Sequence, residues 1–283
     1  MVGNPATRMI PPAGRQARVH SAAASLTQDA VGEFLTAAAD AIARRGRFNV
    51  ALAGGRTPRS VHEQLAGMAE GRLDWGRIHV FFGDERCVPP DHPESNFRMA
   101  SETLLSRVPI PAANIHRICA ELEPETAAST YEQELRTALR PESLPPAESV
   151  SAESSAAILS TETASGPPSL DLVFLGMGAD GHTASLFPGT AALLEPRRWA
   201  VANRVPQLGV DRITLTFPVL NAARRVVFLV TGADKAGVLA EVFAGDGRTP
   251  RHPVEWVRPV RGSVVWLMDA AAAQRWPFPP ASA

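Results

Sequence analysis

The sequence predicts an α/β fold built on a mostly parallel β-sheet. Short apolar runs that end in glycines or charged residues alternate with longer segments whose apolar residues recur at three- and four-residue steps. Because parallel strands need crossover connections, which are usually helices, this alternation favours parallel pairing. The chain has 283 residues, of which 45% are hydrophobic and 20% charged, and this is enough to bury a sizeable core.

The first elements are a helix, a strand and the start of a second helix. In residues 22–45 the apolar side chains follow a helical period, and Gly46 is a typical helix end. Residues 48–53 form a short apolar run that stops at two glycines, which is typical of a buried strand entering a tight turn. Thr57-Pro58 then indicates a helix start, because threonine caps helices and proline fits the first helical position.

The same alternation continues along the chain. Residues 78–82 predict a strand, and residues 96–107 and 125–139 predict helices. The later part predicts strands at 172–175, 226–230 and 264–267, a helix from about 234 to 243, and a short last helix at 270–275.

Two segments do not fit the alternation. Residues 1–15 contain prolines and glycines without an apolar period, and we expect a disordered tail. Residues 141–168 are rich in Pro, Ser, Ala and Glu and cannot bury enough apolar surface to form a core. They are either a domain linker or a loop insertion. We favour a disordered insertion within a single α/β domain of residues 16–283, because the strand after it needs the earlier strands as partners.

Composition and charge argue against several classes of function. Lys and Arg number 28 and Asp and Glu 29, a net charge of −1, whereas nucleic-acid-binding domains usually carry a basic surplus. No apolar run approaches the roughly 20 residues of a membrane span, and the N-terminus lacks the apolar core of a secretory signal. Cys87 and Cys119 cannot form a cysteine zinc site, and we expect reduced thiols in a cytoplasmic protein.

The candidate sites are the loops that follow the strands, since ligands of open parallel sheets bind at the carboxyl ends of the strands. The first loop is Gly54-Gly55-Arg56-Thr57. Its glycines and the helix start that follows favour a bound phosphate. It lacks the spacing of a P-loop, and taken alone a plain glycine turn is the simpler interpretation.

The second loop begins with Gly83-Asp84-Glu85-Arg86 and runs on to Arg98. Prolines at positions 89, 90 and 93 forbid a helix, so the sequence specifies a long irregular loop, and such loops are often functional. Arg86 and Arg98 carry the side chain best suited to bidentate binding of a phosphate or carboxylate. The alternative interpretation is a solvated charged turn.

The third loop, residues 176–189, places Asp180 and His182 among glycines. Its GxGxxG spacing resembles a dinucleotide fingerprint, but Pro188 shortens any following helix, and no acidic residue occurs about 20 positions further on. We therefore reject nicotinamide binding. Histidine is the side chain best suited to proton transfer near neutral pH, and Asp180 can orient it. A purely structural histidine is the alternative.

Two further cations lie in or after late apolar strands. Lys235 follows residues 226–230, where a helix start at the sheet edge can meet an anion. Arg212 lies between apolar neighbours in VDRITLTFP. Taken alone, Lys235 is more simply a solvated lysine, and Arg212 is either a surface strand residue or an anion contact.

Four segments, in this order and spacing, carry a resemblance to a known family: ALAGGRTP, FFGDERCVPPDHPESNFRMA, DLVFLGMGADGHTASLFPG and LVTGADKAGVL. They resemble the 6-phosphogluconolactonase family over roughly residues 18–272. The resemblance implies a Rossmann-like α/β sandwich with helices on both faces of the sheet, shared with glucosamine-6-phosphate deaminases and ribose-5-phosphate isomerases. It also implies hydrolysis of 6-phospho-D-glucono-1,5-lactone to 6-phosphogluconate in the oxidative pentose phosphate pathway, with no metal or organic cofactor.

The resemblance also implies roles for individual residues. His182 would be the general base that activates water, and Asp84 and Asp180 match acids of the related deaminase site. Arg86 or backbone N–H groups would stabilise the oxyanion. The family's phosphate loop usually reads GGST, so Arg56 stands where a serine is expected. The residues expected to bind the substrate and its phosphate are Gly54, Gly55, Arg56, Thr57, Arg98, Arg212 and Lys235.

Two other functions stay open at this point. One is an amino-sugar-phosphate deaminase or isomerase on the same fold, and the other is a non-catalytic sugar-phosphate sensor. The segment HTASLFPG that begins at His182 resembles the lactonase sequence, and none of the expected site residues is missing. Both observations favour the lactonase. The sequence identifies no protein partner.

Overall fold

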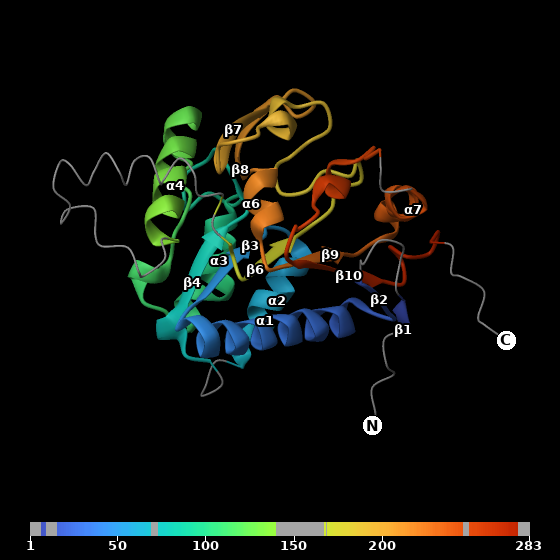
Figure 1. Cartoon of the computed structure of the whole chain (residues 1–283), viewed down its shortest axis with the longest axis horizontal. Coiled ribbons are helices and arrows are strands. Elements are labelled where there is room, and N and C mark those ends of the chain that lie inside the picture. The colour runs from blue at the N-terminus through green and yellow to red at the C-terminus, as the bar shows by residue number, and fades with distance from the viewer. Residues whose placement is uncertain are drawn as a thin grey trace.

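In the computed structural model, which describes residues 7–9, 16–68, 73–139, 167, 169–245 and 249–276, a seven-stranded sheet forms the centre of the molecule (Figure 1). The strand order is β1-β2-β10-β9-β6-β3-β4. All neighbouring pairs are parallel apart from β1 and β2, so the predicted mostly parallel sheet is confirmed. The strands are β1 Thr7–Met9, β2 Gln16–His20, β3 Phe48–Leu52, β4 Ile78–Phe82, β6 Leu172–Leu175, β9 Arg225–Val230 and β10 Ser263–Asp269.

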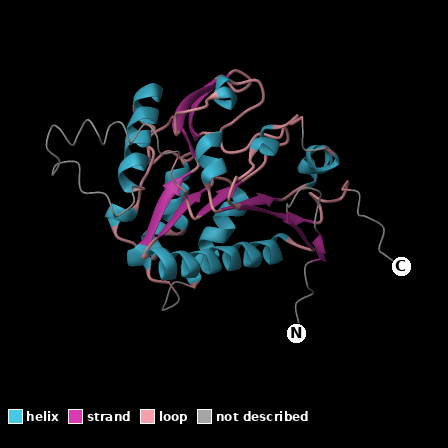
Figure 2. Cartoon of the chain, in the orientation of Figure 1, coloured by secondary structure: helices cyan, strands magenta, loops and turns pink. Residues whose placement is uncertain are grey.

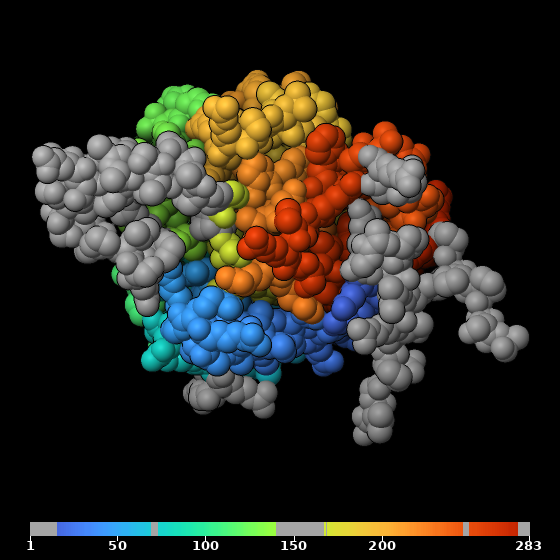
Figure 3. Space-filling view, in the orientation of Figure 1, coloured from blue at the N-terminus to red at the C-terminus, as the bar shows by residue number. Residues whose placement is uncertain are grey.

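The central strands are covered on both faces. Every residue of β3 and β6 is buried; β6 is apolar throughout, and Asn49 is the one polar residue of β3. α1 Ala23–Arg45 lies along one face, and α6 Phe217–Ala222 lies on the opposite side (Figure 2). In the space-filling view the C-terminal segments, orange to red, fill the region between α1 and the upper part of the molecule (Figure 3). The polar ends of the strands are therefore where a ligand can reach the sheet.

The helix ends follow from local chemistry. α1 ends at Gly46 as predicted, because a φ of 75° lets the Gly46 amide donate to the Ile42 carbonyl oxygen. α3 Asn96–Thr103 begins after Ser95, whose hydroxyl oxygen accepts a hydrogen bond from the Arg98 amide. The other helices are α2 Arg56–Gly67, α4 Pro124–Ala138 and α7 Ala236–Ala244. Within the described ranges, the length and hydropathy of the helices rule out a membrane-spanning helix.

A second, antiparallel sheet was not predicted from the sequence. β5 Asp84–Arg86 pairs with β8 Val210–Leu215, which pairs with β7 Ala200–Val205. Gly83 joins the two sheets, since its amide donates to the Leu52 carbonyl oxygen and its own carbonyl oxygen accepts from the Leu215 amide. The chain leaving β4 is thereby turned across the carboxyl edge of the large sheet.

The predicted last helix at residues 270–275 is wrong, because these residues form turns. An alanine-rich run this short does not nucleate a helix by itself. The Asp269 carboxylate also accepts hydrogen bonds from the amides of Gly232 and Ala272, which fixes the turn. The predicted helix 96–107 is likewise shorter, because α3 ends at Thr103 and a separate 3₁₀ turn follows at Leu105–Arg107.

The expectations of disorder are only partly covered by the structure. Within residues 1–15, Thr7–Met9 forms β1 against β2, contrary to a fully disordered tail. The rest of that range lies outside the described residues, and so does the expected insertion 141–168 apart from Pro167. The single-domain organisation stays a prediction.

Two histidines with lowered pKa values should make the folded protein less stable at acidic pH. Burial, with a contribution from Arg59, lowers the pKa of His62 to about 4, and burial together with His116 and Arg47 lowers the pKa of His79 to about 4. The unfolded chain takes up these protons near pH 6.5, whereas the folded chain does so only near pH 4. Stability is therefore lost as the pH falls through this window and does not respond to these groups above it.

The variant His62→Leu tests this origin, because leucine keeps the buried volume without a titrating group. Urea unfolding between pH 6.5 and pH 4.5 should give a slope of the unfolding free energy against pH that is shallower by about one proton. His92→Leu, in the loop before α3, is the matched control, because it makes the same substitution at a side chain that is not buried. An unchanged slope in His62→Leu would contradict the assignment.

Candidate active site

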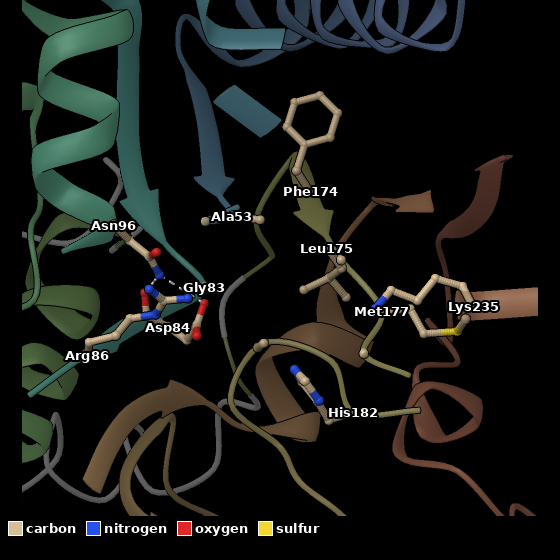
Figure 4. A pocket seen from close by; sticks show the side chains of 14 residues that line it. Ala53, Gly83, Asp84, Arg86, Asn96, Phe174, Leu175, Met177, His182 and Lys235 are labelled. Carbon is tan, nitrogen blue, oxygen red and sulfur yellow. Dashed lines mark hydrogen bonds between the residues drawn. The ribbon is translucent and has the colours of Figure 1, made fainter. Parts of the chain in front are cut away.

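A pocket of about 230 Å³ opens at the carboxyl ends of β3, β4 and β6, and extends to the segment after β9. Figure 4 shows Asp84, Arg86 and Asn96 on one side, Met177 and Lys235 on the other, and His182 between them. Five residues singled out from the sequence line it: Gly54, Asp84, Arg86, His182 and Lys235.

A larger groove of about 590 Å³ lies between α1 and the residues that precede β6 and β9. Its buried carboxylates are already neutralised. Glu33 is paired with Arg18 and Arg225, and Asp171 is paired with Arg45 and Arg224. The smaller pocket is the stronger candidate for two reasons. It is lined by Arg86, which forms no ion pair with a carboxylate of the described residues, and it lies at the carboxyl ends of the strands.

The first glycine loop approaches the pocket through Gly54. A Cβ at this position would lie 1.8 Å from Oδ1 of Asn96, so only glycine allows the two segments to pack. Gly55, and not Thr57 as the sequence predicts, is the residue that precedes α2; it has a φ of 103°, and no side chain caps the first helix amides. Thr57 lies behind the loop, where its hydroxyl is 2.7 Å from that of Thr231 after β9.

Asp84 is buried and belongs to a polar network. Its Oδ2 accepts a hydrogen bond of 2.7 Å from the Ser185 hydroxyl, and its Oδ1 lies 3.4 Å from Nδ2 of Asn96. The Asn96 amide group also donates to the Asp84 carbonyl oxygen at 2.9 Å. Ser185 is therefore a structural donor rather than a nucleophile, because its hydroxyl is directed to a carboxylate and not to a base.

Glu85, next to Asp84, fixes the start of α3. Its side chain is 2% exposed and accepts hydrogen bonds from the Ser95 hydroxyl and from the amides of Asn96 and Phe97. Burial raises the pKa of Glu85 although these amides oppose the shift. The carboxylate at the helix N-terminus thereby holds Asn96 against the pocket and Arg86 beside it.

Arg86 and Arg212 are neighbours across β5 and β8, where they form a register pair. The Arg86 guanidinium donates to the Glu94 carbonyl oxygen, while its buried Nε–H has no partner. Among the described residues no carboxylate forms an ion pair with either arginine. Burial and the nearby Arg86 charge lower the pKa of Arg212. Two unneutralised cations side by side favour an anionic or oxyanionic ligand.

Other residues expected at the site lie outside the pocket lining. Arg98 donates to Glu102 at 2.6 Å and to the Asp91 carbonyl oxygen at 2.9 Å. The Arg56 side chain is exposed at the start of α2, with its charge acting on Asp234. Gly55, Thr57, Asp180 and Arg212 are not among the lining residues, although all except Thr57 are next to one of them in the chain, in the sheet or through a hydrogen bond.

His182 and Asp180 form a hydrogen-bonded pair at the glycine-rich loop after β6. Nδ1 of His182 lies 2.6 Å from Oδ1 of Asp180, which also accepts the His182 amide at 3.1 Å. Partial burial opposes ionisation of Asp180, but His182 holds the pKa of this carboxyl below its usual value. The imidazole stacks on Phe187 with a centroid distance of 4.0 Å. This geometry fixes the ring and leaves Nε2 for proton transfer.

Lys235 lines the pocket opposite Arg86 (Figure 4). It lies in the 3₁₀ turn Ala233–Lys235, and its ammonium group is 2.8 Å from the exposed carboxylate of Asp234. An exposed ion pair of this kind is weak, so an anionic ligand can replace Asp234. The described residues bring together no group of three or more His, Cys, Asp or Glu side chains that could hold a metal ion.

Residues 21–266 match the family model described as glucosamine-6-phosphate isomerases/6-phosphogluconolactonase. The chain belongs to this family. It is 43% identical over 236 residues to a 6-phosphogluconolactonase of Synechocystis sp., covering 83% of this chain and 87% of that one. It is 36% identical over 275 residues to a 6-phosphogluconolactonase of Streptomyces coelicolor, covering 94% and 97%.

Solved structures give the same result. The 6-phosphogluconolactonase of Thermotoga maritima aligns with a TM-score of 0.70 and 31% identity, over 89% of this chain and 98% of that one. The 6-phosphogluconolactonase of Trypanosoma brucei aligns with a TM-score of 0.71 and 28% identity, over 91% and 97%. The family and the fold class predicted from the sequence are confirmed.

Three residues of the polar network were not singled out from the sequence as site residues: Glu85, Asn96 and Ser185. Asn96 follows a helix-capping serine, which is a signal for structure and not for a site. Ser185 reaches Asp84 across 101 positions of the chain, and no local pattern encodes such a contact.

The Gly54–Asn96 contact predicts a specific sensitivity to volume. Gly54→Ala should lower the melting temperature by several degrees, because overpacking typically costs about 1–3 kcal/mol, and should displace the Asn96 side chain. Gly67→Ala, in the same helix–loop unit but with open space at its Cβ, should not lower it. Calorimetry and a crystal structure of each variant measure this, and equal melting temperatures would refute the contact.

Proposed function

We propose that this chain hydrolyses 6-phospho-D-glucono-1,5-lactone to 6-phospho-D-gluconate in the oxidative pentose phosphate pathway. The observation that carries the proposal is the His182–Asp180 pair at a pocket lined by two cations, Arg86 and Lys235. The family and the relatives named 6-phosphogluconolactonase support the same reaction.

In the proposed mechanism His182 acts as the general base. Asp180 accepts the Nδ1–H, so Nε2 carries the free lone pair that removes a proton from water. The water oxygen adds to C1 of the lactone, the bond between C1 and the ring oxygen breaks, and the proton passes from His182 to the departing oxygen. A lactone is an activated ester, so this route requires no covalent nucleophile.

We propose that the phosphate binds between the start of α2 and Lys235. The bond between the Thr57 and Thr231 hydroxyls ties the α2 N-terminus to the segment that leads to Lys235. In this proposal the amides at the start of α2 and the ammonium group of Lys235 bind the same phosphate dianion. The lactone ring extends from there past His182 towards Arg86, whose unpartnered Nε–H suits the oxyanion that develops at C1.

The cytoplasm is the compartment that we propose for this reaction. Cys87 and Cys119 are both free thiols, and burial raises the pKa of Cys87 to about 11, so that this thiol stays protonated and unreactive. The small phosphorylated lactone is the partner proposed; nucleic acid and membrane form no part of the proposal.

Removing the base and removing the phosphate cation should have different kinetic effects. His182→Ala should lower kcat by at least about 100-fold, because general-base catalysis contributes that much or more. Lys235→Ala should mainly raise KM, by about tenfold, because a charged hydrogen bond to the phosphate is lost in substrate and transition state alike. Both are measured on freshly generated lactone with correction for spontaneous opening.

The reverse pattern would overturn these assignments. A wild-type rate no faster than spontaneous hydrolysis would overturn the proposed function itself. Release of ammonia from glucosamine 6-phosphate would then indicate a deaminase, and binding of 6-phosphogluconate without turnover would indicate a sensor.

Arg86 and Arg98 provide a matched pair within one loop. Arg86→Ala should lower kcat/KM by about 100-fold, as expected for loss of an oxyanion donor. Arg98→Ala should change it by less than about twofold, because this guanidinium is bonded to Glu102 on the surface and such pairs contribute little. Comparable losses in the two variants would place Arg98 in the site after all.

A further inference from the structure

His252 lies directly beneath the loop that carries Asp180 and His182, although it is not among the residues lining the pocket. Gly181 has a φ of 79°, and a Cβ built on it would lie 2.6 Å from Cβ of His252. The loop backbone therefore rests on this side chain. We propose that His252 is a positioning residue that holds the Asp180 backbone, and with it the His182 imidazole, in register with the substrate; this inference rests on the proposed function.

Two successive carbonyl groups of the loop are held by the segment that contains His252. The Val254 amide donates to the Gly181 carbonyl oxygen at 3.1 Å, and Nδ1 of His252 lies 3.4 Å from the Asp180 carbonyl oxygen. The second contact is long for an N–H···O bond, so its contribution is modest. It is nevertheless the side-chain contact that reaches the residue orienting the base.

The other ring nitrogen of His252 is directed at α7. Its Nε2 lies 2.9 Å from Oε2 of Glu241. A carbonyl oxygen and a carboxylate oxygen are both acceptors, and the two ring nitrogens of His252 are the groups that can donate to them. Glu241 thus orients a ring that bridges α7 and the backbone of the catalytic loop.

The backbone around His252 is itself fixed. Glu255, which is 4% exposed, accepts hydrogen bonds from the amides of Arg251 and His252. A buried carboxylate bonded in this way keeps the start of the Pro253–Trp256 turn in place. The ring of His252 therefore acts from a rigid support.

The consequence for catalysis concerns orientation and not binding. Asp180 bonds His182 through its carboxylate and His252 through its carbonyl oxygen. When the second bond is lost, the Asp180 backbone gains freedom, and Nε2 of His182 is less often aligned with the attacking water. Neither ring nitrogen of His252 contacts Lys235, so the proposed phosphate contact is kept. We therefore expect a lower kcat at an unchanged KM.

Two substitutions separate the two ring contacts. In His252→Asn the side-chain amide can occupy the position of Nδ1 and still donate to the Asp180 carbonyl oxygen. In His252→Gln it can occupy the position of Nε2 and still reach Glu241. We expect kcat near the wild-type value in His252→Asn and about five- to tenfold lower in His252→Gln, with KM unchanged in both.

A role limited to anchoring α7 makes the opposite prediction, since His252→Gln would then be active and His252→Asn impaired. That result, or wild-type kcat in both variants, overturns the proposal. If both variants lose activity, hydrogen exchange of the loop 178–186 decides. Faster exchange than in the wild type supports the positioning role of His252, and unchanged exchange overturns it.

Hydrogen exchange of the substrate-free protein also separates this inference from the proposed function. If the wild type does not hydrolyse the lactone, the proposed function fails. Faster exchange in His252→Gln but not in His252→Asn would still support the positioning role of His252. Thermal unfolding of the three proteins serves as the control for folding.

Discussion

The need to cover both faces of a buried parallel sheet is the constraint on which the rest of the molecule depends. Strands such as β3 and β6 have no exposed residue, so helices must cross over and cover them on either side. Only the ends of the strands are left for polar loops. At the carboxyl edge these loops meet, and Asp84, His182 and Lys235, which are far apart in the sequence, come to line one pocket.

The sequence predicts elements well where one local pattern decides the outcome. The apolar runs 78–82 and 172–175 coincide with β4 and β6, and Gly46 ends α1 where expected. The His182–Asp180 pair is found for the same reason, since the two residues are two positions apart. Prediction fails where tertiary pairing decides. β7 and β8 mix polar and apolar residues and form because they pair with each other and with β5.

Close packing of backbone against side chain defines the site as much as charge does. A Cβ on Gly54 would collide with Asn96, and a Cβ on Gly178 would lie 2.1 Å from Nδ1 of His182. Without a Cβ, these glycines let the side chains of Asn96 and His182 approach the backbone closely. The sequence shows where the glycines are, but it does not show which side chain packs against each one. Arg98 illustrates the converse, because it has the right chemistry and loop but bonds Glu102 instead.

The pocket draws its lining from Ala53 to Lys235, and β10, the last strand, pairs with both β9 and β2. A fragment that lacks either end of this range therefore lacks part of the pocket lining. Ligand binding and global folding become linked equilibria, because the ligand binds only when the segments that line the pocket have assembled on the sheet. The binding free energy of such a ligand adds to the stability of the whole fold, so the unfolding temperature should depend on the ligand concentration.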